Sequence, residues 1–347
     1  MIDWRAGYHS SWRVYRVNPD TWADAGLLPG VTEITVERGR ESVGTTLESG
    51  SMSVDVAVGA GFEPGYYRIV MLAEQNEEVE RVELATLWCE SATGNVDRGI
   101  DQTSVTCSSV LHPAQTTLLE AGSYAPAGVN GAMFVVDMLS EAINAPVVAD
   151  GSFTLDDHYV FDAGQQVIDA CWKLLDAGSF VIRVSGDGTV HVTPKPTKPS
   201  LSLDSANARL LHPGVEHTLD YSQVPNRYRA TDGTYRAEAV NDDPSSITST
   251  ARRGFFHDAN DTSPVRVNGE TLGAYATRML REKSTVLDER TYEREWWPDV
   301  YPGDVVKGSL PSVDLDGDMR VQSQNLACGR GVTVTETSAR EVVLWQG

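Results

Sequence analysis

Apolar and polar residues alternate in six short segments ahead of Pro113. The segments are WRVYRV (12–17), VTEITVER (31–38), SMSVDVAV (51–58), YYRIVMLA (66–73), RVELATLWCE (81–90) and TSVTCSSV (103–110). A period of two is typical of β-strands, whose successive side chains point to opposite faces. Six short strands at regular spacing predict a β-barrel or a β-sandwich for this region.

The middle of the chain changes to helical spacing. Asn130 is a predicted N-cap for a helix over residues 131–143, whose apolar stripe is Phe134, Val135, Met138, Leu139 and Ala142. A second helix is predicted in QQVIDACWKLLDAG. Asp162 and Gln165 have the spacing of a capping box ahead of it, and Gly178 suits the C′ position at its end.

The second helix leads directly into a predicted β-hairpin. Its strands are SFVIRV and TVHVTP, and its turn is Ser185-Gly186-Asp187-Gly188. The following segment, TPKPTKPS, holds prolines at 194, 196 and 199. Because proline cannot donate a ladder hydrogen bond, this segment predicts a linker or the edge of a domain.

Beyond the prolines, strands are predicted to resume. They are HTLDYS, NRYRATDG, TYEREWW, DVVKGSL, MRVQSQNLA, GVTVTETS and AREVVLW, and the polar segment VNDDPSSITSTARRG predicts a long loop. One more helix is predicted to open at Asn268, with Leu272, Tyr275, Met279, Leu280 and Lys283 along a single stripe.

The segment EREWWPDVYPGDVVKG (293–308) combines aromatic residues with a turn signal. Pro302 and Gly303 have the conformations that the two central positions of a type II turn require. Trp297 precedes a proline, which favours extended backbone, so residues 290–297 are predicted to be a strand. Tyr292 and Trp296 fall on one face of it and Trp297 on the other. Because both faces also carry charge, the strand is expected to meet a neighbouring chain or domain.

Composition sets the scale of the molecule and excludes some partners. The chain has 347 residues, 41% hydrophobic and 22% charged, with 30 glycines and 16 prolines, which fits two or three β-rich, turn-rich domains. The formal net charge is -21, spread from Asp3 to Glu341. That charge argues against gripping nucleic acid through its phosphates and against docking on anionic lipid.

The cysteines and the amino terminus bear on the compartment. Cys89, Cys107, Cys171 and Cys328 are widely spaced, without a CxxC or Cys/His ligand pattern, and are interpreted as reduced, buried thiols. The amino terminus has no apolar signal-peptide core, and no apolar run is long enough to cross a bilayer. Synthesis and folding in a cytoplasm are therefore expected.

The sequence contains none of the common catalytic motifs. The chain has no GxSxG, HExxH or Walker-type GxxxxGK[ST], and no GxGxxG at a strand-to-helix junction. His212 and His217, five apart around Pro213 and Gly214, have the wrong spacing for two ligands on one helical face and are interpreted as solvated loop residues. The sequence therefore predicts no catalytic, cofactor-binding or metal-binding residue.

One acidic segment allows a metal-binding alternative. Asp314, Asp316 and Asp318 alternate in DLDGDM, a spacing that lets carboxylates converge on calcium. The glycine comes too early for an EF-hand loop, and Asn325 stands where a bidentate glutamate is needed. A polar hairpin turn between SLPSV and MRVQSQ is the favoured interpretation.

A second alternative is a sugar site. Glu293, Glu295 and Asp299 beside the two tryptophans could supply a glycosidase carboxylate pair with a stacking platform. The favoured interpretation is strand charge at an interface, because carboxylates at such spacing are common on strands of every function. The isolated tryptophans are interpreted as core or contact residues: Trp4, Trp12, Trp22 and Trp172.

The order of these elements resembles the baseplate hub or tail-hub proteins of tailed bacteriophages, also called tail-tip or tail-associated proteins. Four features carry the resemblance over nearly the whole chain. They are the β-segment from WRVYRV to SMSVDVAV, the unit FDAGQQVIDACWKLLDAGSFVIRVSGDGTVHVTP, the strand NRYRATDG, and the last predicted helix followed by DERTYEREWWPDVYPGDVVKG.

The resemblance implies an α+β, β-rich fold in three parts. Residues 1–115 would form an amino-terminal tube-like β-barrel domain, 116–198 a central α/β domain with a helix and hairpin, and 199–347 a second tube-like barrel with one helix. The family has no catalytic residue in this core, so no enzyme activity and no cofactor are implied. The chain is expected to end at Gly347 without an added lytic or receptor-binding domain.

The resemblance also implies an assembly. The expected state is a homotrimeric ring at the virion tail tip, built in the bacterial host cytoplasm, that joins the tail tube to the tip and surrounds the DNA channel. Expected partners are the distal tail protein and tail tube, the tape-measure protein, and tip or receptor-binding proteins. DNA would be met only in transit, without stable membrane insertion. The alternative function is a carbohydrate-binding or cell-wall glycan-cleaving tail protein.

Overall fold

The structure is a computed structural model that describes residues 2–40, 46–55, 63–97, 100–156, 158–207, 210–231, 233–262 and 270–346. The chain divides into two compact units. Unit 1 comprises Met1–Val215 and Tyr292–Ser338, and unit 2 comprises Glu216–Thr291 and Ala339–Gly347. Both units are therefore built from two separate stretches of chain, and the three-part division expected from the sequence stays a prediction.

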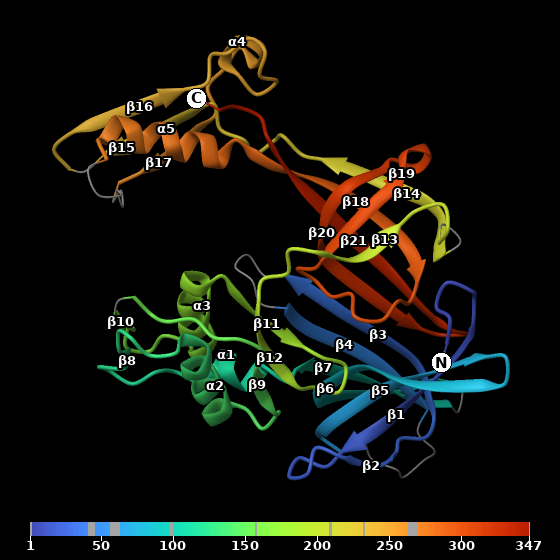
Figure 1. Cartoon of the computed structure of the whole chain (residues 1–347). Helices are drawn as coiled ribbons and strands as arrows, with labels where there is room; N and C mark the ends of the chain where they lie inside the picture. The colour runs from blue at the N-terminus through green and yellow to red at the C-terminus, as the bar shows by residue number, and fades with distance from the viewer. Residues whose placement is uncertain are drawn as a thin grey trace. The chain divides into compact units, whose positions relative to one another are not determined.

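The amino-terminal strands of unit 1 form an antiparallel array in the order β3-β4-β7-β6-β5-β1-β2 (Figure 1). They are β1 (His9–Val17), β2 (Asp24–Leu27), β3 (Val31–Arg40), β4 (Thr46–Asp55), β5 (Gly65–Gln75), β6 (Glu78–Asp97) and β7 (Ile100–Ser109). The six predicted strands are present in the described residues, positions 56–58 of the predicted strand SMSVDVAV lie outside them, and the short β2 was not predicted. The β-rich fold class is confirmed, whereas the pair of closed barrels stays a prediction.

Strand β5 is buried on both faces. Tyr66 belongs to a core shared with the helices of the central region, whereas Tyr67, Ile69 and Met71 belong to a second core on the other face. Burial on both faces favours apolar residues, which explains the run of buried side chains from 66 to 71 apart from the charged Arg68. This arrangement positions the central region against the sheet.

The central region packs three helices with a three-stranded sheet (Figure 1). Its elements are α1 (His112–Thr116), β8 (Tyr124–Ala125), α2 (Gly131–Ala142), β9 (Val147–Ala149), β10 (Tyr159–Val160), α3 (Val167–Gly178), β11 (Phe180–Val184) and β12 (Val190–Pro194). Asn130 is the N-cap of α2, as predicted, and its side chain accepts from the backbone N–H groups of Ala132 and Met133. The predicted hairpin is β11–β12.

Both ends of α3 differ from the sequence prediction. The helix begins at Val167 after Gln166, whose side chain forms no cap, although Gln165 Oε1 accepts from the backbone N–H of Asp162 at 3.2 Å. At the other end Ser179, with φ 55°, takes the left-handed conformation expected of Gly178. Gly178 is required for space instead, because a Cβ there would overlap the ring of Phe153.

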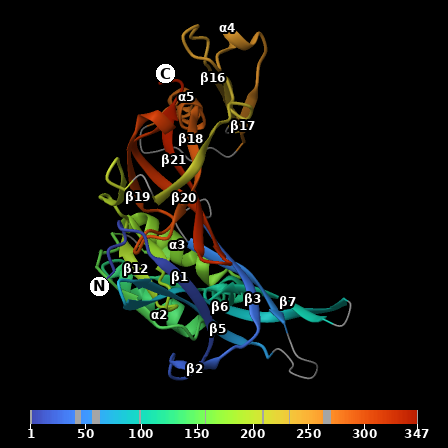
Figure 2. The same ribbon diagram turned by 90° about the vertical axis from the view of Figure 1, so that its right-hand side faces the viewer.

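The carboxy-terminal strands continue the same sheet, because β20 pairs with β3 (Figure 2). The elements are β13 (Pro199–Leu203), β14 (Leu211–Leu219), β18 (Thr285–Glu295), β19 (Val305–Leu310), the 3-10 turn η2 (Pro311–Val313), β20 (Leu315–Cys328) and β21 (Val332–Val343). Pro194 ends β12 and Pro199 begins β13, so the prolines bound a short linker between strands, as predicted.

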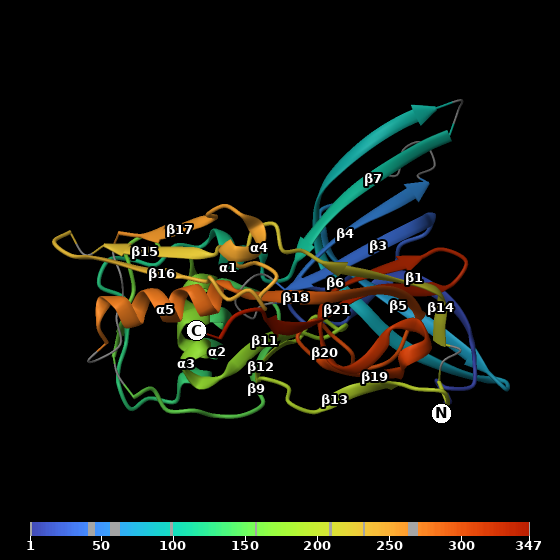
Figure 3. The ribbon, with the colours of Figure 1, turned by 90° about the horizontal axis from the view of Figure 1, so that it is seen from above.

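Unit 2 holds a three-stranded sheet with one helix packed on it (Figure 3). Its elements are β15 (Arg227–Thr231), β16 (Arg236–Val240), α4 (Thr250–Arg253), β17 (Asp258–Asp261) and α5 (Leu272–Lys283). The N-cap of α5 is Thr271, whose Oγ1 accepts from the N–H of Ala274 at 3.2 Å, and the predicted start at Asn268 lies outside the described residues. The predicted long loop contains α4, capped by Ser249.

Two of the four cysteines are paired. Cys89 and Cys107 lie opposite one another on β6 and β7 and form a buried disulfide, whereas Cys171 and Cys328 are free and buried. The interpretation of all four as reduced thiols is therefore wrong for the first two. Spacing along the chain could not reveal the pair, because it depends on how β6 and β7 are aligned.

Candidate functional site

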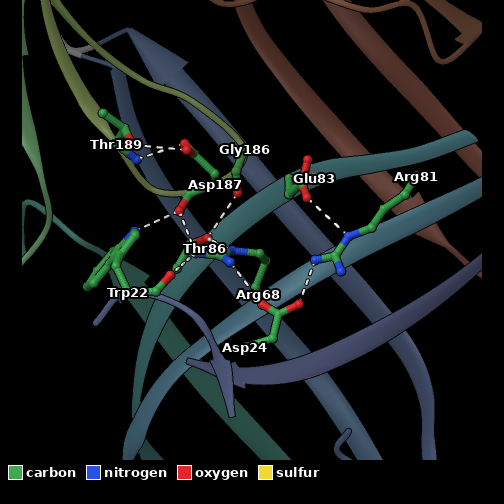
Figure 4. A network of polar contacts seen from close by, with 9 residues as sticks. All are labelled: Trp22, Asp24, Arg68, Arg81, Glu83, Thr86, Gly186, Asp187 and Thr189. Carbon is green, nitrogen blue, oxygen red and sulfur yellow. Dashed lines mark hydrogen bonds and ion pairs between the residues drawn. The ribbon is translucent and has the colours of Figure 1, made fainter. Parts of the chain in front are cut away.

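The tip of the β11–β12 hairpin lies on strands β5 and β6, within unit 1 (Figure 4). The backbone carbonyl of Asp187 accepts from Trp22 Nε1 at 2.8 Å and from Arg68 Nη2 at 2.9 Å. Thr86 Oγ1 donates to the carbonyl of Gly186 at 2.9 Å. These bonds join the central region to the amino-terminal sheet through the backbone of a single turn.

Two glycines allow this close approach. A Cβ at position 186 would overlap the backbone carbonyl of Glu83. At Gly188, φ is +85°, and a Cβ would come within 2.8 Å of the Thr86 side chain and 2.9 Å of the Trp22 ring. The SGDG turn is therefore shaped for contact with the sheet as well as for reversing the chain.

Arg68 is the central side chain of this contact. It is 7% exposed, and its Nη1 donates to Asp24 Oδ1 at 2.8 Å while its Nη2 also donates to the carbonyl of Trp22 at 3.0 Å. Arg81 Nη2 donates to the second carboxylate oxygen of Asp24 at 2.6 Å. A buried guanidinium is stable only with such partners, so replacing Arg68 would leave several acceptors unsatisfied.

The Asp187 carboxylate stabilises the turn from within. Its oxygens accept from the backbone N–H and the hydroxyl of Thr189, each at 3.0 Å, and from Ser185 Oγ. Burial by itself raises the pKa of Asp187, but the hydrogen bonds from Ser185 and Thr189, with the charge of Arg68, lower it below its ordinary value overall. The turn is thus held in one conformation by an ionised carboxylate.

A second contact joins the same hairpin to the carboxy-terminal region. Arg183 on β11 forms an ion pair with Asp304, which is fully buried. The guanidinium groups of Arg38 and Arg183 each lie 4.9 Å from the centroid of the Tyr301 ring. Residues from all three sequence regions therefore meet at one turn.

That turn is the predicted Tyr301-Pro302-Gly303-Asp304. Gly303 has φ +94°, and the N–H of Asp304 donates to the carbonyl of Tyr301 at 3.0 Å, so the predicted turn is confirmed. Asp304 Oδ2 also accepts from the N–H of Tyr301 at 2.9 Å. Burial raises the pKa of Asp304, with the charge of Arg183 opposing that rise.

Strand β18 ends at Glu295, two residues before the predicted end, and Trp296 directly after it points inward. Trp296 is 7% exposed and packs edge-on against Trp4, with ring centroids 5.2 Å apart. Tyr292 lies on the same face, where Arg294 Nη2 donates to the buried Glu336 at 2.6 Å. The buried Trp296 ring packs within unit 1 and offers no platform to a sugar, whereas the contact of this strand with a neighbouring chain or domain stays a prediction.

The carboxylates that suggested glycan chemistry have another partner. His212 lies between Glu293 and Glu295, with Nδ1 3.0 Å and Nε2 3.1 Å from their oxygens. The hydrogen bond to Glu295 is the largest influence raising the pKa of His212. Asp299 is a turn residue with φ 56°. Glu293 and Glu295 therefore share one histidine partner, and Asp299 lies in the turn that follows the strand.

The two histidines are strand residues, which corrects their interpretation as loop residues. Both lie on β14, and His217 Nε2 is 2.8 Å from Asp288 Oδ1. The Pro213-Gly214 pair suggested a loop, but β14 is an edge strand, where proline is tolerated.

The aspartates of DLDGDM lie at the β19–β20 hairpin. Asp314 caps η2 with φ 60°, and Asp316 and Asp318 occupy exposed positions of β20 opposite Ser309 and Lys307. Within the described ranges, the structure brings together no group of three His, Cys, Asp or Glu side chains that could hold a metal ion. The same part of the chain has no helix long and apolar enough to span a membrane.

The two contacts of the β11–β12 hairpin, with strands β5 and β6 and with the turn at 301–304, are together called the junction. Most of its pairings could not be predicted from the sequence. The SGDG turn was predicted and Trp22 was interpreted as a core or contact residue, but Arg68 and Thr86 carry no local signal because they lie on strands distant in sequence. The close contact of glycine with backbone at position 186 is visible only in three dimensions.

Comparison with solved structures identifies the class of fold. The tail protein from Neisseria meningitidis MC58 is similar with a TM-score of 0.63 and 12% identity, over 97% of this chain and 98% of that one. The 43 kDa tail protein of prophage MuSo2 from Shewanella oneidensis is similar with a TM-score of 0.59 and 12% identity, over 95% and 97%.

A chain of the Francisella PdpA-VgrG complex is similar with a TM-score of 0.57 and 9% identity, over 99% of this chain and 60% of that one. No protein-family model and no curated sequence matches. The chain therefore has the fold of these tail proteins, and the resemblance seen in the sequence is confirmed at the level of the fold.

Proposed function

We propose that this chain is a non-enzymatic structural subunit of a phage tail, located at the tip or baseplate hub. The observation that carries the proposal is the likeness of fold over nearly the full length of a prophage tail protein and of a second tail protein. The junction supports it, because a hairpin joined to both the amino-terminal sheet and the carboxy-terminal turn suits a subunit that has to keep its shape in an assembly.

The proposed assembly is a homotrimer that forms a ring. Each chain would contribute two tube-like barrels, one from residues 1–115 and one from 199–347, so that three chains present six barrels to a sixfold tail tube. The formal net charge of -21 favours a channel that repels passing DNA rather than binding it. Proposed neighbours are the distal tail protein, the tail tube, the tape-measure protein and tip or receptor-binding proteins.

Cryo-electron microscopy of the assembled particle tests this proposal. The expected result is density for this chain at the tail tip in three copies, each with two barrels. Six copies, or one barrel per chain, would overturn the ring. A glycan array and a cell-wall release assay on the purified protein separate the structural proposal from the carbohydrate-binding or glycan-cleaving alternative. We expect no saturable sugar binding in the first and no cell-wall release in the second.

A further inference from the structure

We infer that unit 1 carries a cationic cleft that binds an acidic side chain of a neighbouring protein. The cleft lies beside the junction, and its walls include Val181, Arg183, Lys195, Pro196, Pro302 and Arg320. Three of the eight residues that line the cleft are basic, in a chain whose formal net charge is -21. The inference rests on the proposed role as an assembly subunit and names one surface through which that subunit meets a partner.

The cleft is built by hydrogen bonds between its walls. Arg320 Nη1 donates to the carbonyl of Pro196 at 3.4 Å and also to that of Gly303, which ties the linker after β12 to the turn at 301–304. The backbone N–H of Lys195 donates to the carbonyl of Ser179 at 2.9 Å, which fixes the position of this residue. These hydrogen bonds within the protein therefore fix the walls of the cleft before a ligand binds.

The charges in the cleft are only partly neutralised. Arg183 is paired with the buried Asp304. Within the described residues, no ion pair or hydrogen bond of the Lys195 ammonium is found, and the hydrogen bonds of the Arg320 guanidinium go to backbone carbonyls. The charges of Lys195 and Arg320, beside the neutral Arg183–Asp304 pair, therefore favour an anionic group between them.

The size and lining of the cleft limit what enters. The space open to a water-sized group is about 10 Å³, which is room for one oxygen atom of a carboxylate rather than for the whole group. Val181, Pro196 and Pro302 supply apolar walls around the three cations. The chemistry fits the carboxylate of an exposed Asp or Glu whose neighbours are apolar, presented by a protein partner; a bulky ring or a whole nucleotide would not enter.

The full-length protein can be tested with three probes in ligand-detected NMR. They are acetyl-Leu-Glu-Leu amide, the uncharged acetyl-Leu-Gln-Leu amide, and a single-stranded oligothymidylate that offers phosphates instead. The expected result is saturable binding of the Glu peptide with a dissociation constant on the order of 1 mM. That binding should weaken with salt, and the other two probes should bind at least tenfold more weakly.

Matched variants connect the binding to the cleft. Lys195→Glu is expected to reduce Glu-peptide affinity at least tenfold, whereas Lys198→Glu, the same charge change three residues along the linker, should leave it unchanged. If the reversed charge impairs folding, Lys195→Ala replaces it in the same measurement and is expected to reduce Glu-peptide affinity severalfold. Equal binding of the Gln peptide, preference for the oligonucleotide, absence of Glu-peptide binding, or equal effects at 195 and 198 would each overturn the inference.

The outcome for the cleft is separate from the outcome for the proposed function. Loss of peptide binding in Lys195→Glu would support the cleft. Absence of the chain from purified tails would refute the tail role and leave that support for the cleft unchanged. Conversely, a chain found at the tail tip that binds no Glu peptide would keep its role and lose the cleft.

Discussion

Arg183 and Asp304 form an ion pair although they are 121 positions apart in the sequence. The carboxylate is fully buried, whereas the guanidinium side chain is 24% exposed. The pair connects β11 to the turn before β19, so the central hairpin and the carboxy-terminal strands are held together by charge as well as by apolar packing. A buried carboxylate that loses its partner becomes strongly unfavourable in its ionised form.

The first prediction is that Arg183→Met destabilises the protein by about 3 kcal/mol, the low end for a broken buried pair, because Arg183 is partly exposed. Adding Asp304→Asn should recover at least half of the loss, since the uncompensated charge is then removed. Urea unfolding of both single variants and the double variant measures the coupling. Additive losses would mean that the two residues do not stabilise one another.

The second prediction concerns pH in the same variant. Burial raises the folded-state pKa of Asp304 above that of the unfolded chain, and loss of Arg183 raises it further. The folded state then binds more protons than the unfolded state, so stability falls as pH rises from about 4 towards 7. Urea midpoints of Arg183→Met at several pH values should show this fall more steeply than wild type, and Asp304→Asn should remove the difference.

A third prediction tests the turn at Gly303. Its φ is +94° and no atom lies within 4 Å of the position that a Cβ would take, so a substitution is unfavourable through backbone strain alone. Gly303→Val is expected to cost about 1–3 kcal/mol. Gly303→Asn should cost less, because asparagine tolerates the left-handed region. Thermal unfolding compares the two variants, and equal melting temperatures would contradict the strain argument.

The features that the sequence predicts well are those with local causes. The six amino-terminal strands follow from alternation, the N-cap of α2 from Asn130, and the turn at 301–304 from Pro302 and Gly303. Each depends on residues a few positions apart, whose preferences survive in the folded chain.

The features that could not be predicted depend on strand alignment. Arg68 meets Asp187 only because the β11–β12 tip lies on β5 and β6. His212 and His217 gained acidic partners because β14 pairs beside β18, although Pro213 and Gly214 suggested a loop. No periodicity within a segment contains this information.

A fourth prediction tests the contact between the hairpin tip and the sheet. Gly186→Ala places a methyl group on the backbone carbonyl of Glu83, which cannot move as a side chain can. The expected cost is about 1–3 kcal/mol, the usual range for overpacking. Gly39→Ala on β3 is the control, since no atom lies within 4 Å of its Cβ and its φ is not positive.

Hydrogen exchange locates the effect of that substitution. In Gly186→Ala, faster exchange is expected at residues 185–189 and around Trp22, because the carbonyls of 186 and 187 lose their donors. The control should exchange as wild type does. Faster exchange confined to unit 2, or no change at 185–189, would show that this turn does not hold the two regions together.

The last prediction concerns the cysteines. Reduction of Cys89–Cys107, which encloses a loop with a sequence separation of 18, is expected to lower the free energy of unfolding by about 3 kcal/mol through the entropy of the unfolded chain. Burial raises the pKa of Cys171 and Cys328 to about 12, so neither thiol should react with iodoacetamide at pH 8 before unfolding.

Mass spectrometry should therefore count no modified cysteine in the native protein, two after unfolding, and four after unfolding with reductant. A Cys89→Ala/Cys107→Ala variant is the control: reductant should leave its urea midpoint unchanged, whereas it lowers that of wild type. Four reactive thiols in unfolded protein without reductant would show that the two strands are not cross-linked. The alignment of β6 with β7 would then rest on its hydrogen bonds alone.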